Sequence, residues 1–139
     1  MEPLERLRRQ ILAEHGELRA AIAKVATAEE PARLALATNA LCDLLEDHLA
    51  FEDEVLEPVL RTIDAWGPER ARRLREEHAA QRARLAELRR DVATAPALAL
   101  AREVQPFLEE LLADMANEEH DVLDPELFRD DTVSVEFGG

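Results

Sequence analysis

The stretch His48-Leu-Ala-Phe-Glu52-Asp-Glu-Val-Leu-Glu-Pro58 decides the fold, because part of it is repeated further along the chain. Its second half returns as Glu119-His-Asp-Val-Leu-Asp-Pro125, 67 residues later (125 − 58 = 67). A shorter echo links Glu14-His15 to Glu77-His78, with an offset of 63 (78 − 15 = 63). Since self-similarity at a fixed period is the signature of a repeated structural unit, two similar offsets indicate one helix–helix unit used twice.

The composition favours a helical domain. The chain has 139 residues, is rich in Ala, Leu, Glu and Arg, and contains four Gly and no Tyr. Its net charge of −14 argues against nucleic acid and anionic membranes as partners. Cys42 is the only cysteine, so no disulfide framework is expected, and no run is apolar enough for a signal peptide or membrane span. We therefore expect a soluble, cytoplasmic protein.

Four segments carry apolar side chains three or four residues apart, which is the spacing of a helix face. They run over residues 4–25, 34–59, 74–92 and 104–122. Short connections favour antiparallel neighbours. The sequence therefore predicts an all-α fold, an antiparallel up-down-up-down four-helix bundle over residues 1–129. Residues 130–139 would be a C-terminal tail that wraps the bundle or contacts a neighbouring molecule.

Prolines and capping residues mark the expected helix boundaries. Thr27 and Glu30 have the spacing of a capping box, and Pro31 is tolerated in the first turn of the second helix. Pro58 should kink or end that helix. Pro106 lies inside the fourth segment, so the fourth helix either bends there or begins only near it.

Gln81 and five ionisable side chains interrupt the apolar faces; the five are His15, His48, Glu52, His78 and Glu119. His48 and Glu52 lie one helical turn apart and project from the same face. A single histidine on such a face is more often a core residue than a ligand, but a buried carboxylate is so costly that it needs a countercharge. A metal ion would satisfy all five side chains. Imidazole and carboxylate donors without thiolate suit iron or manganese, with zinc as an alternative.

Together these residues resemble the hemerythrin-like, or HHE cation-binding, domain family, over residues 4 to about 127. Members of that family hold two non-haem irons inside an antiparallel four-helix bundle. The resemblance implies a set of five metal ligands in this chain: His15, His48, Glu52, His78 and Glu119.

Two positions depart from the family's pattern. Aligning the two repeated prolines places Met115 where the family has its fourth-helix histidine, and a thioether is a poor ligand for iron. His120 follows Glu119 and could supply the missing donor only if the helix is locally rotated. Oxygen-carrying members have a further histidine on the third helix, where this chain has Arg82. These differences argue against reversible oxygen carriage.

Three functions remain open. The first is a hemerythrin-like non-haem iron protein, mononuclear or dinuclear, that senses or handles oxygen, nitric oxide, peroxide or iron. The second is a metal-free bundle that acts as an interaction or regulatory module through its acidic surface. The third is an enzyme that decomposes peroxide or repairs iron–sulfur clusters, which is less favoured because no proton-relay residue stands beside the ligands. The expected ligand is a diatomic molecule or peroxide, and a homodimer is compatible with the sequence.

Overall fold

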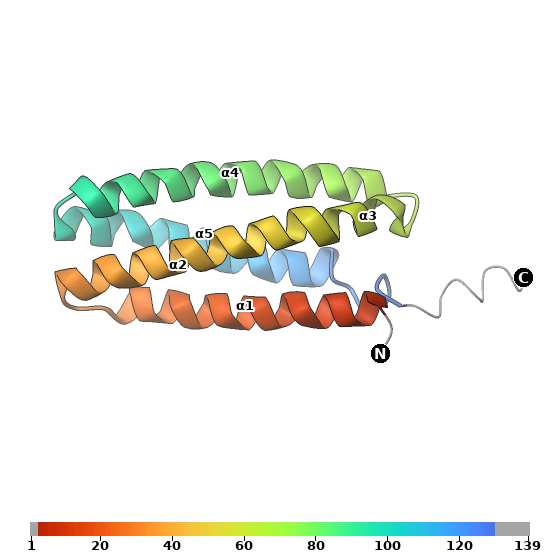
Figure 1. The fold of residues 1–139 in the computed structure, drawn as a ribbon, viewed down its shortest axis with the longest axis horizontal. Helices are drawn as coiled ribbons and strands as arrows, with labels where there is room; N and C mark the ends of the chain where they lie inside the picture. The colour runs from red at the N-terminus through yellow and green to blue at the C-terminus, as the bar shows by residue number, and fades with distance from the viewer. Residues whose placement is uncertain (1–2, 130–139) are drawn as a thin grey trace, which may run out of the picture.

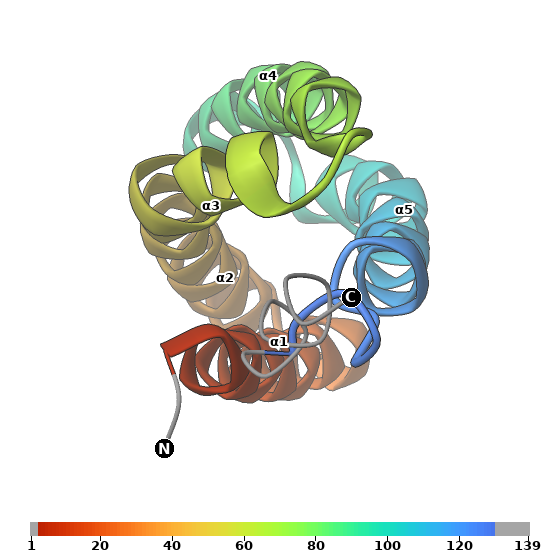
Figure 2. The ribbon, with the colours of Figure 1, turned by 90° about the vertical axis from the view of Figure 1, so that its right-hand side faces the viewer.

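Four helical rods lie side by side in the computed structural model, which describes residues 3–129 (Figure 1). Their elements are α1 (Pro3–Thr27), α2 (Pro31–Phe51), the π-helix η1 (Glu52–Leu56), α3 (Glu57–Ile63), α4 (Gly67–Thr94) and α5 (Ala97–Asp121). The segments α2, η1 and α3 follow one another without a break and make a single rod. Viewed end-on, the four rods surround a common axis, and successive rods are antiparallel (Figure 2). The predicted all-α four-helix bundle is confirmed.

The second rod contains a turn that the sequence did not reveal. The backbone N–H of Glu57 donates to the carbonyl of Glu52, five residues back, so η1 is one residue wider than an α-helical turn. Pro58 follows in the next turn, where it neither ends the helix nor interrupts the rod. A proline lacks an N–H and its ring crowds the turn before it. The wide π-turn of η1 is that preceding turn, so it gives the ring of Pro58 room. Such turns are frequent at functional sites.

The capping-box prediction is wrong, and one of the two alternatives predicted for Pro106 is excluded. Thr27 belongs to α1, where its hydroxyl donates to the carbonyl of Ala23 at 2.8 Å, and Glu30 precedes α2 without a side-chain cap. The capping box therefore does not form, although Pro31 does stand in the first turn of α2. α5 begins at Ala97 and runs through Pro106, so it does not start near that proline.

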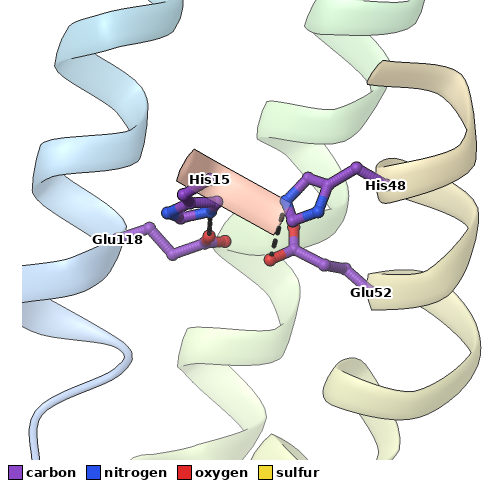
Figure 3. A group of neighbouring side chains, drawn as sticks. All are labelled: His15, His48, Glu52 and Glu118. Carbon is purple, nitrogen blue, oxygen red and sulfur yellow. Dashed lines mark ion pairs between the residues drawn. The ribbon is translucent and has the colours of Figure 1, made fainter. Parts of the chain in front are cut away.

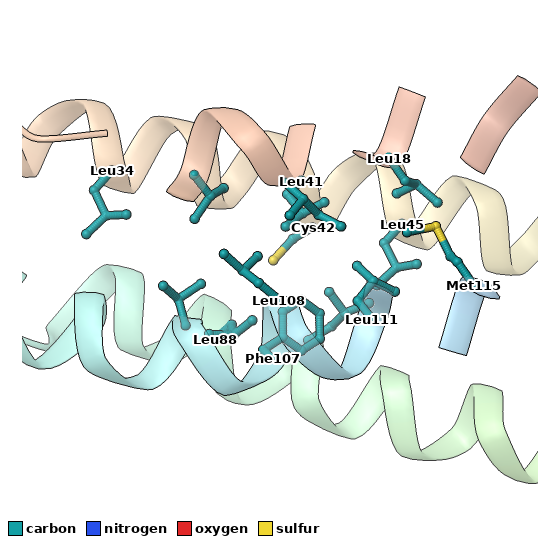
Figure 4. Close-up of a cluster of buried hydrophobic side chains, with 14 of the residues drawn as sticks. Leu18, Leu34, Leu41, Cys42, Leu45, Leu88, Phe107, Leu108, Leu111 and Met115 are labelled. Atoms are coloured by element: carbon teal, nitrogen blue, oxygen red, sulfur yellow. The ribbon is translucent and has the colours of Figure 1, made fainter. Parts of the chain in front are cut away.

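The apolar core is divided into two clusters. The larger one lies towards the α2 and α5 N-termini and contains Leu18, Leu41, Leu108 and Met115 among others (Figure 4). The smaller one lies at the opposite end, and Phe128, just beyond α5, is 1% exposed and packs into it. Along every rod the residues between these clusters are polar, so the bundle holds a polar layer between two apolar ones.

None of the helices within residues 3–129 is long and apolar enough to cross a membrane. The predicted tail, residues 130–139, lies outside the part of the chain that the structure describes.

Candidate metal centre

The polar layer is built from one or two buried side chains on each rod. α1 supplies His15, α4 supplies His78 and the second rod supplies His48 and Glu52, while α5 supplies Glu118. Their exposed fractions are 0% for His15, 6% for His48, 1% for Glu52, 1% for His78 and 7% for Glu118. Three imidazoles and two carboxylates therefore meet in the interior, which requires mutual neutralisation or a bound cation.

Four of these residues form a compact group (Figure 3). His15, His48, Glu52 and Glu118 each offer one nitrogen or oxygen atom, and these atoms all lie within 4.8 Å of one another. Nε2 of His15 is 2.7 Å from Oε1 of Glu118, and Nε2 of His48 is 3.3 Å from Oε2 of Glu52. The group could hold one metal ion.

His78 approaches the group from the other side. Its Nε2 lies 3.0 Å from Oε1 of Glu52. The two oxygens of Glu52 therefore face different histidines, one in each half of the bundle.

Each buried histidine also has a carboxylate at its other ring nitrogen. The Nδ1 atoms lie 2.7 Å from Glu119 for His15, 2.6 Å from Glu14 for His48 and 2.7 Å from Asp53 for His78. An ionised carboxylate only accepts hydrogen bonds, so Nδ1 carries the proton in all three rings. Metal-binding histidines are usually held in this way, with the second nitrogen left for the ion.

Two atoms of the layer lack hydrogen-bond partners: Nε2 of His15 and Oε2 of Glu52 are fully buried and make no hydrogen bond. The close approach of Glu118 to His15 does not have the alignment of a hydrogen bond. These atoms face a cavity of about 10 Å³ that the whole layer lines, which is about the size of one water molecule or ion. Nitrogen and oxygen atoms that border a small void and make no hydrogen bond there fit a metal ion.

The pKa values of the buried groups in the metal-free layer also indicate a place for a cation. Burial raises the pKa of Glu118 to about 7, and the charge of Glu52 adds to this effect. Burial works against the charged form of His48, but the neighbouring carboxylates of Glu52 and Glu14 outweigh it and raise the pKa of His48 to about 9. Burial likewise opposes ionisation of Glu52, yet the neighbouring imidazoles of His48 and His78 lower its pKa. In the metal-free layer, bound protons therefore neutralise the buried carboxylates, which is a role that a metal cation could take over.

Four of the predicted ligands face the interior of the bundle, and two do not. His15, His48, Glu52 and His78 all face the interior as expected. Glu119 does not: it is 26% exposed and holds Nδ1 of His15 from outside the cavity. Glu118, which is not among the predicted ligands, takes the inner position. His120 is exposed and contacts Asp121 at 2.8 Å, so it does not fill a gap in the centre.

The shift by one residue comes from the spacing between the interior glutamate and the following proline, which differs between the two halves. The carbonyl of Glu52 accepts the N–H of Glu57 and the carbonyl of Glu118 accepts that of Leu123, five residues on in both cases. Glu118 is thus the counterpart of Glu52. Pro58 follows Glu52 by six residues, whereas Pro125 follows Glu118 by seven (58 − 52 = 6; 125 − 118 = 7). An alignment on the prolines therefore selects Glu119.

The same shift changes the residue that replaces the family's fourth-helix histidine. The position one turn before Glu118 belongs to Asp114 rather than to Met115. Asp114 accepts a hydrogen bond from Nε2 of Gln81 at 2.9 Å and lines the cavity. Met115 also borders the cavity, but it is 4% exposed and packs in the larger apolar cluster.

Comparison with known proteins agrees with this geometry. The model of the hemerythrin HHE cation-binding domain matches residues 6–125. No curated protein and no solved structure shows significant similarity to the chain. The matched segment runs from the first turn of α1 to the turn after α5, and it contains every residue of the polar layer. The chain belongs to the hemerythrin HHE cation-binding domain family.

Proposed function

We propose that the polar layer binds non-haem iron, and that the protein senses or handles oxygen, nitric oxide, peroxide or iron through that centre. The observation that carries the proposal is a pair of buried atoms that make no hydrogen bond, Nε2 of His15 and Oε2 of Glu52, in residues that line one small cavity. The residues that would hold the first ion are His15, His48, Glu52 and Glu118.

The donor set supports iron before other metals. Two imidazoles and two carboxylates suit iron or manganese, and zinc is a weaker alternative. A thiolate is not available, because Cys42 lies in the larger apolar cluster and burial raises its pKa to about 11. Manganese would occupy the same donors where iron is scarce.

A second ion would have a different environment. His78 provides the one imidazole there, and Asp114 stands where a histidine would complete the family's pattern. Glu77 also lines the cavity, and burial together with the charge of Asp114 raises its pKa to about 7. This side offers one imidazole where the first offers two, so the second ion would bind more weakly than the first, and the centre would be mononuclear at low metal concentration.

The size of the cavity limits what the centre handles. A volume of about 10 Å³ is about that of one water molecule or ion, and it excludes an organic substrate. Bound iron would supply an open coordination position and a change of oxidation state. The surrounding side chains hold the imidazoles in place, and the apolar clusters on either side keep bulk water away.

Two alternatives remain distinct from this proposal. One is a metal-free bundle that acts as an interaction or regulatory module. The other is an enzyme that turns over peroxide or repairs iron–sulfur clusters. Metal content separates the first alternative from the proposal, and steady-state consumption of peroxide or release of iron separates the second.

The test is anaerobic titration of chelator-treated protein with ferrous iron, followed by elemental analysis and a visible absorption spectrum after exposure to oxygen or nitric oxide. We expect one tightly bound equivalent and a weaker second one, and a spectrum that changes with the added gas. His15→Ala should remove the tight equivalent, whereas His120→Ala, at an exposed histidine, should not. Failure of the wild-type protein to bind ferrous iron would reject the proposal.

A further inference from the structure

Two arginines occupy equivalent places in the two halves of the bundle. Arg19 follows His15 by four residues on α1, and Arg82 follows His78 by four residues on α4. The offset between the two arginines is 63 (82 − 19 = 63), the same as between the two histidines. The internal repeat therefore includes the arginines as well as the histidines.

Each arginine binds the carboxylate that holds the neighbouring histidine. Nη1 and Nη2 of Arg19 donate to Oε2 and Oε1 of Glu119 at 2.8 and 3.0 Å. The same Oε2 lies 2.7 Å from Nδ1 of His15. The imidazole is thus tied through one carboxylate to a guanidinium at the surface.

The second half repeats the arrangement with an aspartate. Arg82 donates to Oδ2 of Asp53, while Oδ1 of the same group lies 2.7 Å from Nδ1 of His78. In both halves a series of hydrogen bonds leads from the interior imidazole through a carboxylate to an arginine. The side chains of Arg19 and Arg82 are 40% and 45% exposed.

These contacts also join helices. Glu119 is next to Glu118 on α5, and Asp53 is next to Glu52 on η1. An arginine that holds Glu119 or Asp53 therefore fixes a histidine and, through the backbone, the adjacent interior carboxylate. His48 lacks this support: its partner Glu14 is approached by Gln10 at 3.4 Å instead.

We infer that Arg19 and Arg82 are matched positioning residues of the metal centre. Arg19 keeps Nε2 of His15 aimed at the cavity through Glu119. Arg82 does the same for His78 through Asp53. The inference rests on the proposed function, because it assigns the arginines to the ion that the layer would hold. Half-exposed ion pairs contribute little to folding stability, whereas loss of a partner behind a metal-bound histidine typically weakens metal binding by roughly 10–100-fold.

The first experiment measures ferrous iron affinity by anaerobic competition with a chromophoric chelator. Arg19→Gln should weaken the tight equivalent by roughly 10-fold, and Arg82→Gln should weaken the second equivalent to a similar extent. Arg89→Gln is the control, because Arg89 also joins α4 to the second rod, through Asp43 and Glu46, with no histidine behind them. Wild-type affinity in Arg19→Gln and Arg82→Gln, or an equal loss in Arg89→Gln, would overturn the inference.

The second experiment uses the metal-free protein and stands apart from the proposed function. Imidazole Nδ1 protons give distinct downfield NMR signals when a hydrogen bond protects them from exchange. We expect Arg19→Gln to broaden or shift the His15 signal and leave that of His78, and Arg82→Gln to do the reverse. In a Glu119→Gln background, Arg19→Gln should have no further effect on His15. Unchanged signals in both single variants would overturn the inference whether or not the protein binds iron.

Discussion

Oε1 of Glu118 lies 2.7 Å from Nε2 of His15, inside the bundle and without the alignment of a hydrogen bond. The carboxylate next to it in sequence, Glu119, lies at the other nitrogen of the same ring. Two adjacent glutamates therefore have separate roles: one faces the cavity and the other orients the imidazole.

Substitution of the two glutamates should separate these roles. Glu118→Gln removes a ligand and should abolish the tight ferrous iron site. Glu119→Gln should leave that site weakened by roughly 10–100-fold, the usual cost of losing an outer hydrogen-bond partner. Iron titration monitored by chelator competition measures both. A greater loss in Glu119→Gln than in Glu118→Gln would show that Glu119 is the ligand.

Although Glu118→Gln should weaken iron binding, it should raise the thermal stability of the metal-free protein. Burial and the charge of Glu52 raise the pKa of Glu118 to about 7, so above that pH two buried carboxylates repel each other. A neutral amide removes this repulsion. We expect the variant to melt higher than wild type at pH 8 in chelator, and lower than wild type when ferrous iron is present. A lower melting temperature in chelator would contradict this account.

The pH dependence of stability should also depend on metal. The pKa values of Glu118, about 7, and His48, about 9, both exceed the unperturbed values of 4.5 and 6.5. A raised pKa stabilises the fold below the unperturbed value and loses that effect as pH rises through the raised one. Metal-free protein should thus be most stable near pH 5 and weaken up to pH 9.

With ferrous iron the trend should reverse, because metal binding requires deprotonated ligands. The difference in melting temperature between iron-loaded and chelator-treated protein should therefore widen from pH 5 to pH 8. Thermal melts followed by circular dichroism at fixed ionic strength measure it. A difference that stays constant with pH would show that these groups do not bind the ion.

Helical periodicity was enough to predict much of this centre. Apolar residues at a spacing of three or four define the inner face of each rod, so the interior positions of His15, His48, Glu52 and His78 followed from the sequence. The same rule could not separate Glu118 from Glu119. They lie three and four residues after Met115, and both spacings fall on one helix face.

Other features depend on tertiary geometry that no local pattern records. The π-turn at Glu52–Leu56 contains one residue more than an α-helical turn. The apolar residues around it keep the sequence spacing of an ordinary helix, so the sequence pattern does not reveal it. The carboxylates behind the histidines, Glu14, Asp53 and Glu119, come from neighbouring rods, and their contacts depend on how the rods pack. The offset of 63 between Arg19 and Arg82 equals that between His15 and His78, so the sequence already identified the two arginines as equivalent positions of the repeat.

The missing histidine of the fourth helix can be tested by restoring it at two adjacent positions. Asp114→His places an imidazole one turn before Glu118, as His48 stands before Glu52, and should strengthen binding of the second iron. Met115→His introduces an imidazole into the larger apolar cluster and should destabilise the fold by about 1–3 kcal/mol, with or without metal. Iron titrations and thermal melts compare them. A larger gain in iron binding from Met115→His would reverse the assignment.

Two glycines offer a matched test of the fold itself. A Cβ added to Gly67 would lie 1.9 Å from the carbonyl oxygen of Leu60, where the chain turns from α3 into α4. Nothing lies within 4 Å of a Cβ added to Gly16, which is exposed in the middle of α1. Gly16→Ala should therefore stabilise the protein by about 0.5–1 kcal/mol, since alanine is the better helix former.

Gly67→Ala should destabilise the protein strongly, because the obstructing atom belongs to the backbone and cannot rotate away. Denaturant unfolding of the two variants in chelator gives both free energies without a contribution from bound metal. Equal stability of the two variants would show that the turn between α3 and α4 does not require the close approach of Gly67 to Leu60.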